Sequence, residues 1–92
     1  MSEKTRFLFK KGVVDIIIYL GQVDEAGYYE LYKLGYVVSR QTFANILKAL
    51  EKRSIVHREV LDTHPPRVNY SLTTKGERIK SQLEAILKEL EV

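Results

Sequence analysis

Apolar positions recur along this chain first at helical spacing, with a period of about 3.6 residues, and later with a period of two. The run from Lys10 to about Gly21 is mostly apolar and holds no helix breaker, which predicts a buried helix. A second, shorter helix is expected next, with Asp24 as a candidate N-cap and Gly35 as its C-terminal stop. The pattern therefore predicts two successive helices in the first part of the chain.

A third helix is expected over residues 39–53, and its two faces differ sharply. Ser39 is a good N-cap, because its hydroxyl can accept a backbone N–H of the first turn that has no helical partner. The apolar face is formed by residues at helical spacing, namely Phe43, Ile46, Leu47 and Leu50. The other face is polar, basic and rich in amides, and it carries Arg40, Gln41, Ala44, Asn45 and Lys48. We expect the first face to pack on a core and the second to remain free.

The period then falls to two, which predicts a hairpin of two strands over residues 55–61 and 67–73. In the second strand one face is apolar and holds Val68, Tyr70 and Leu72, whereas the other is polar and holds Arg67, Asn69 and Ser71. Proline cannot donate to a strand ladder, so Pro65 and Pro66 are expected in the connecting loop or at an exposed edge. The hairpin should pack on the helices through its apolar face.

The last helix follows, with either Thr73 or Thr74 as its cap and Glu77 in its first turn. Its apolar stripe consists of Ile79, Leu83, Ile86, Leu87 and Leu90. This stripe is longer than the core of one small domain requires, so we expect part of it to pack on a second copy of the chain, together with Phe7 and Phe9. The alternative is that the helix folds back on its own domain.

The expected order is thus helix, helix, helix, strand, strand, helix, in one domain over residues 1–92. This order predicts a mainly α, α+β fold: a winged helix-turn-helix with a three-helix core and a two-stranded wing over about 10–73, and a dimerisation helix over 74–92. Residues 62–67 would form the outer part of the wing.

Charge is distributed unevenly around the net value of +3. Residues 40–80 hold nine Lys or Arg against four Asp or Glu, a local charge of +5 that leaves −2 for the rest of the chain. Such an asymmetry favours a face that binds a polyanion, although a random fluctuation of surface charge would look the same.

The composition excludes several other classes of protein. There is no cysteine, so disulfides, thiolate metal sites and thiol switches are absent from the sequence. The most apolar run, residues 13–20, is too short to cross a bilayer and lacks the flanks of a signal peptide. We expect a cytoplasmic protein associated with the nucleoid of a prokaryotic or archaeal cell. The abundance of Ile, Tyr, Lys and Glu also suits a thermophile.

No catalytic or metal-binding motif is present, and we expect neither an enzyme nor a cofactor. The two histidines, His57 and His64, have no acidic or thiol ligands at metal spacing. Four tyrosines crowd the second helix and the turn after it, at positions 28, 29, 32 and 36. They could form a stacking platform or an effector pocket, but core and subunit packing is the favoured interpretation, and nothing indicates an effector.

The segment "QTFANILKALEKRSIVHREV" followed by "PPRVNYSLTTKGERI" resembles the winged-helix transcriptional regulators of the HxlR type, which are related to the MarR and PadR groups. The resemblance covers roughly residues 11–90, and the wing signature from Pro65 to Gly76 is its specific part. It departs from the family at Ser54, where a glycine is usual, and in lacking the N-terminal cysteine of redox-sensing members. A thiol sensor is therefore ruled out.

Carried over by position, the polar face of the third helix is the family's groove-facing surface, and Arg67 lies on its wing. Gln41 and Asn45 could bond bidentately to adenine, and Arg40 could bond to guanine or, like Lys48, to phosphate. His64 is a further candidate for a phosphate contact. The full predicted set of DNA-contacting residues is Ser39, Arg40, Gln41, Ala44, Asn45, Lys48, His64, Arg67 and Asn69.

The sequence thus predicts a homodimeric regulator that binds double-stranded DNA with its third helix in the major groove and its wing on the backbone or minor groove. A two-fold dimer would present two third helices to successive major grooves. Repression is favoured over activation. The alternatives are a protein-interaction module and a DNA-binding architectural protein without sequence preference.

Overall fold

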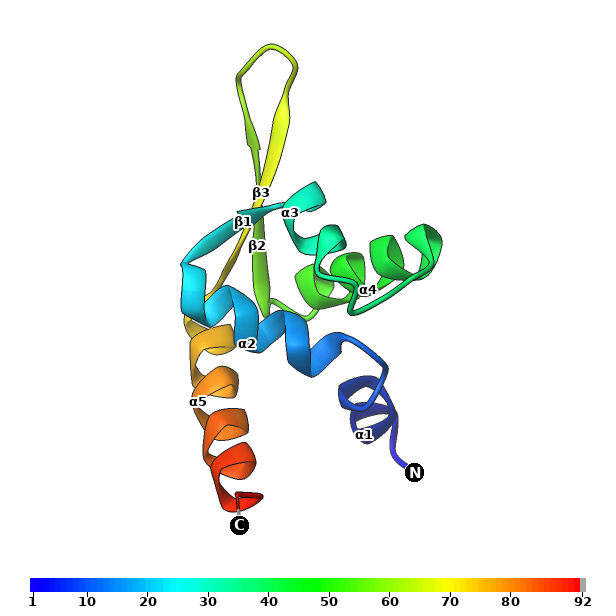
Figure 1. Cartoon of the computed structure of the whole chain (residues 1–92), viewed down its shortest axis with the longest axis vertical. Coiled ribbons are helices and arrows are strands. Elements are labelled where there is room, and N and C mark those ends of the chain that lie inside the picture. Colours follow the sequence, from blue (N-terminus) through cyan, green and yellow to red (C-terminus); the bar gives the residue numbers. More distant parts are fainter. Residues whose placement is uncertain (92) are drawn as a thin grey trace.

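The computed structural model describes residues 1–91 and has the expected winged helix-turn-helix architecture (Figure 1). The elements within these residues are α1 (Glu3–Leu8), α2 (Val13–Val23), β1 (Glu25–Gly27), α3 (Tyr28–Lys33), α4 (Arg40–Lys52), β2 (Val56–Leu61), β3 (Arg67–Leu72) and α5 (Thr74–Glu89). The β2–β3 hairpin projects from one end of the helical body, and α5 extends from the other end. The last residue of the predicted dimerisation segment 74–92 lies outside the described residues.

The core lies where α2, α3, α4 and the base of the sheet meet. Its largest wholly buried side chains are Val13, Ile16, Ile17, Leu20, Leu31, Phe43, Leu47, Leu50 and Val56. Most of them come from α2, which the sequence predicts as a buried helix, and from α4, whose apolar face the sequence identifies. Burial of these apolar side chains is the main force that holds the helices together. Among residues 1–91, no helix combines the length and the apolar character needed to span a membrane.

The sheet has three strands in the order β1–β3–β2, all antiparallel, so the expected two-stranded wing gains a third strand at its base. Residues 25–27 of β1 pair with residues 69–71 of β3. Asp24 was expected to cap a helix at this point, and that expectation is wrong. It ends α2 instead, with a φ of 69° and its N–H donated to the carbonyl of Leu20 at 3.1 Å. A three-residue strand has no period of its own, and its partner lies more than forty residues away.

The N-terminal region also differs from the expectation in detail. Residues 3–8 form the short helix α1, which the sequence pattern did not predict, with its N-terminus capped by Ser2. The next helix, α2, begins at Val13 rather than at Lys10 and continues two residues past Gly21. Gly12 separates the two helices with a φ of 95°, a conformation that favours glycine. The turn at Gly12 therefore sets where α2 begins.

The junction of α4, β2 and α5 brings together three segments under the hairpin. Thr73, rather than Thr74, caps α5: its hydroxyl accepts the N–H of Gly76 at 3.0 Å. A Cβ at Gly76 would collide with the carbonyl of Ile55, the residue just before β2, so the close approach of α5 to this segment requires glycine. Lys75 donates to the carbonyl of Arg53 at 2.8 Å and so satisfies the C-terminal end of α4. These contacts fix α4 relative to both the hairpin and α5.

Candidate nucleic-acid interface

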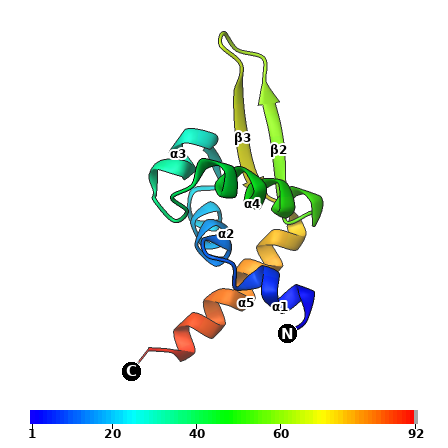
Figure 2. The ribbon, with the colours of Figure 1, turned by 90° about the vertical axis from the view of Figure 1, so that its right-hand side faces the viewer.

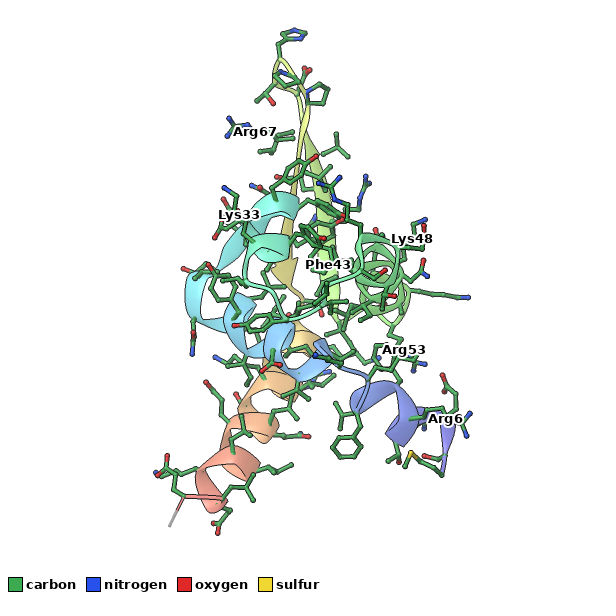
Figure 3. All side chains as sticks on the ribbon, turned by 45° about the vertical axis from the view of Figure 1, so that its right-hand side comes forward. Arg6, Lys33, Phe43, Lys48, Arg53 and Arg67 are labelled. Atoms are coloured by element: carbon green, nitrogen blue, oxygen red, sulfur yellow. The ribbon has the colours of Figure 1, made fainter. Side chains whose placement is uncertain are left out.

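The helix α4 separates an apolar face from a solvent-exposed polar face, as the sequence predicts. Ser39 is its N-cap, with its hydroxyl accepting the N–H of Thr42 at 3.2 Å. In Figure 3, Phe43 points toward the body of the molecule, whereas Lys48 points away from it. Of the other predicted contact residues on this helix, Arg40, Gln41 and Asn45 are exposed. Ala44 is half-buried beside the hairpin.

Two amides on successive turns of α4 form a pair. The Nε2 of Gln41 donates a hydrogen bond to the Oδ1 of Asn45 at 3.1 Å. Adenine is recognised by an amide that offers both its oxygen and its NH₂ group. Because an amide oxygen has two lone pairs, the Oδ1 of Asn45 can accept a second hydrogen bond from an adenine while it keeps the contact with Gln41. The hydrogen bond holds the two side chains together on the exposed face of α4.

Arg40 is placed by the aromatic cluster of α3. Its guanidinium carbon lies 5.5 Å from the centroid of the Tyr32 ring, within the range of a cation–π contact. The Tyr32 hydroxyl donates to the carbonyl of Val38 at 2.8 Å, which secures the turn that leads into α4. The rings of Tyr28 and Tyr32 pack on Phe43 at centroid distances of 5.2 and 5.3 Å. These two tyrosines thus support the start of α4 from within the body of the domain.

The hairpin carries the predicted wing residues, in two kinds of environment. His64, Pro65 and Pro66 are exposed in the loop, and Arg67 is exposed at the start of β3, where Figure 3 shows it beside the upper hairpin. Asn69 differs, because it is half-buried and its Nδ2 donates to the Oε1 of Glu25 on β1 at 3.4 Å. Asn69 therefore contacts β1.

A groove of about 530 Å³ runs between α4 and the hairpin, and we call it the hairpin-side groove. It is lined by Tyr28, Ala44, Lys48, Glu51, Arg58, Val68 and Tyr70. Burial raises the pKa of the Tyr70 phenol above its ordinary value, while the neighbouring Arg58 acts in the opposite direction. The phenol is therefore neutral near pH 7 and can act as a hydrogen-bond donor. The groove thus holds two basic side chains, Lys48 and Arg58, together with the carboxylate of Glu51 and the Tyr70 phenol.

Arg58 also belongs to this surface, although it is not among the contact residues predicted from the sequence. In the register of the sheet it lies opposite Tyr70, and the pairs next to it on the same face are Val56 with Leu72 and Val60 with Val68. The alternation of β2 could have indicated this position. An arginine between two valines on the apolar face of a strand must extend to the edge of that face. Its basic end thus faces α4 across the hairpin-side groove.

The predicted dimerisation residues fall into two groups. Phe7 and Leu83 are buried in their own chain, and Ile79 is half-buried against the same core. The others are largely exposed: Phe9 at 71%, Ile86 at 57%, Leu87 at 43% and Leu90 at 71%. An apolar groove between α1 and α5, lined in part by Leu8, Ile79 and Ile86, connects the two groups. Figure 2 shows α1 and α5 at the end of the body opposite the hairpin.

The chain matches the model of a known protein family over almost its whole length. The family is described as HxlR-like helix-turn-helix, and the match covers residues 7–91. The relatives include an HTH-type transcriptional regulator from Synechocystis, 42% identical over 50 residues, and the HTH-type transcriptional regulator YodB from Bacillus subtilis, 38% identical over 55 residues. These matches cover 54% and 60% of this chain, but only 37% and 46% of the relatives. The chain thus matches less than half of the length of either relative.

A solved structure extends the likeness to the complete fold. The putative transcriptional regulator ytfH from Salmonella typhimurium superposes with a TM-score of 0.78 at 27% sequence identity. That match covers 96% of this chain and 78% of the other. The α1–α2 region and α5 are therefore included in the similarity, along with the helix-turn-helix and the hairpin.

Proposed function

Because this chain belongs to the HxlR-like helix-turn-helix family, we propose that it binds double-stranded DNA and regulates transcription. The observation that carries the proposal is the exposed face of α4, where Arg40, Gln41 and Asn45 stand free of the core. Its relatives are described as transcriptional regulators, which supports the same function. An α-helix fits the major groove of DNA, where each base pair presents a distinct set of donors and acceptors.

Each predicted contact has a role that follows from its chemistry. Gln41 and Asn45 suit adenine, and Arg40 suits the O6 and N7 of guanine or a phosphate. Lys48 and Arg58, which line the hairpin-side groove, suit the phosphate backbone that passes between α4 and the wing. Arg67 at the wing suits the adjacent minor groove, and His64 in the loop suits phosphate there. Ser39 acts through the cap that orients the first turn of α4.

We also propose that the protein acts as a homodimer. The exposed apolar side chains of α5 continue into the apolar groove that α1 and α5 form, at the end of the body opposite the hairpin. A two-fold pairing through it would leave both copies of α4 free for DNA. Their targets would be half-sites about 34 Å apart on a near-palindromic duplex. Such a dimer covers two successive major grooves, which would block access to a promoter, so repression is the favoured outcome.

The test begins with selection of the tightest binders from a random pool of labelled duplexes, followed by fluorescence anisotropy at low and moderate salt. We expect a preferred sequence that persists as salt rises. Asn45→Ala should lose roughly five- to 150-fold in affinity for that sequence, because a bidentate base contact supplies about 1–3 kcal/mol of discrimination. Gln22→Ala, which removes an exposed amide from the end of α2, is the matched control and should bind like the wild type.

Two results would contradict this function in different ways. Binding that collapses with salt and enriches no sequence would indicate an architectural protein that contacts only phosphate. The absence of binding even at low salt would indicate that the fold serves as a protein-interaction module. A reporter gene whose expression falls when the protein is removed would overturn repression alone.

A further inference from the structure

A second hollow borders α4 on the side turned away from the hairpin. It has a volume of about 270 Å³, and we call it the loop-side hollow. It is lined by Phe7, Lys10, Lys11, Thr42, Asn45, Ile46 and Ala49. Two of these residues, Lys10 and Lys11, come from the turn between α1 and α2 rather than from the helix-turn-helix itself. A region distant in sequence thus contributes two cations to the border of α4.

The charges in the loop-side hollow are all of one sign. Lys10 and Lys11 are exposed, and neither forms an ion pair within residues 1–91. No acidic side chain lines this hollow, whereas Glu51 lines the hairpin-side groove. The exposed hydroxyl-bearing residue Thr42 adds a neutral donor on the α4 side. The hollow therefore offers a binding surface for an anion that lies along the helix.

The turn that carries these lysines is held by backbone hydrogen bonds. The N–H of Lys10 donates to the carbonyl of Phe7 at 3.1 Å, and the N–H of Val13 donates to the carbonyl of Lys10 at 3.1 Å. Phe7 is in turn buried in the core. The backbone at Lys10 and Lys11 is thereby fixed relative to α4, and only the lysine side chains need to be ordered when a ligand binds.

The dimensions of DNA identify the ligand. A helix with its side chains is about 10–12 Å across, and the major groove is about 12 Å wide, so an inserted helix has one sugar–phosphate strand along each side. The hairpin-side groove lies on one side of α4, with Lys48 and Arg58. The loop-side hollow lies on the other, because Asn45 and Ala49 border it while Ala44 and Lys48 border the groove. The two depressions match the two strands that flank a major groove.

We propose that Lys10 and Lys11 bind the phosphate backbone along the edge of the major groove opposite the wing. The protein then holds α4 between two backbone contacts, one from the hairpin and one from the turn before α2. This inference rests on the proposed function, since it assigns a further contact to the same DNA complex. It predicts a contact to phosphate alone, without any part in the choice of base.

The test compares the double variant Lys10→Gln/Lys11→Gln with Arg78→Gln/Lys88→Gln, which removes the same charge from exposed positions on α5. Affinity for the selected duplex is measured by anisotropy from 50 to 300 mM salt. The first variant should bind roughly tenfold more weakly or worse near 0.1 M salt. Its slope of log K against log salt should be shallower by roughly 2, because each phosphate contact contributes about 0.9. The ranking of duplex sequences should not change.

The position of the contact is tested by ethylation interference on the same duplex. With wild-type protein, ethylated phosphates should interfere on both edges of the major groove, and with the Lys10/Lys11 variant the edge opposite the wing should no longer do so. If the variant keeps the wild-type slope and interference pattern while the wild type binds DNA, this inference is wrong and the proposed function stands. If neither the wild type nor the α5 control binds any duplex, the proposed function itself fails.

Discussion

The helices α4 and α5 have the same kind of sequence pattern, but their apolar stripes are buried to different extents in the structure. Each begins with a hydroxyl cap and carries one apolar stripe. The stripe of α4, formed by Phe43, Ile46, Leu47 and Leu50, is nowhere more than 4% exposed. The stripe of α5 is buried at Leu83 and then emerges, until Leu90 is 71% exposed. Periodicity thus identifies the apolar face of a helix, whereas burial depends on what lies opposite that face.

The difference also separates the partners that the two helices are suited to. In α4 the core accepts the whole apolar stripe, so the surface left over is polar and basic and suits a polyanion. In α5 the core accepts only the first half, so the surface left over is apolar and suits another apolar surface. We expect the protein to bind DNA through α4 and to bind a second copy of itself through the last turns of α5.

The sharpest test of this contrast is the same substitution made in both helices. Leu50→Ala should lower the free energy of unfolding by about 2–5 kcal/mol, because it leaves a cavity in a packed core. Leu90→Ala, in the exposed part of α5, should change it by less than about 0.5 kcal/mol in dilute protein. Urea denaturation followed by circular dichroism measures both values. Equal costs for the two variants would mean that α5 is buried in solution even in the dilute chain.

The association of α5 is tested by placing charges on its exposed stripe. Ile86→Glu/Leu90→Glu should weaken the proposed dimer by roughly thirtyfold or more, equivalent to about 2 kcal/mol, because carboxylates would be buried without partners. Sedimentation equilibrium gives the dissociation constant. Ser81→Glu/Lys88→Glu, at two other exposed positions of the same helix, is the control and should remain associated. A wild type that is monomeric at all accessible concentrations would contradict the dimer.

Loss of the N-cap of α4 or α5 should lower the free energy of unfolding by less than the cavity at Leu50. Ser39→Ala should cost about 1 kcal/mol, the usual value for a lost N-cap. Thr73→Ala should cost more, roughly 1–2 kcal/mol, because the same hydroxyl also donates to the carbonyl of Ser54 at 2.5 Å. Thermal unfolding of both variants measures the difference. A smaller cost at Thr73 than at Ser39 would show that the junction under the hairpin contributes little to stability.

The elements that the sequence predicts well are those whose signals are local. The bounds of α4 agree with the expectation, because Ser39 and the apolar residues that follow lie within a few turns of one another. The hairpin is equally well predicted, since strand alternation and the two prolines fall within one short segment. By contrast, β1 depends on pairing between Ala26 and Tyr70, and no pattern in residues 25–27 predicts this strand.

The candidate interface likewise contains residues that local sequence patterns predict and residues that they do not. The polar face of α4 follows from its helical period, and the predicted contact residues on it are exposed or, for Ala44, half-buried. The position of Lys10 and Lys11 beside Asn45 could not be foreseen, because it depends on how the turn at Gly12 packs the α1–α2 region against α4. In α5 the sequence identifies the stripe but does not reveal that Leu83 would be used within the chain.

The short strand β1 has a mechanical consequence for the hairpin. It pairs with β3 only at residues 69–71, so beyond Asn69 the hairpin continues as a two-stranded ribbon, with Val60 already 56% exposed. The hairpin is therefore held in the sheet at Tyr70 and free at His64, and its stiffness should decrease toward the tip. Amide hydrogens near the tip should exchange faster than those near Tyr70. In the proposed DNA complex, such a hairpin would bend to follow a minor groove of varying width while α4 keeps its position.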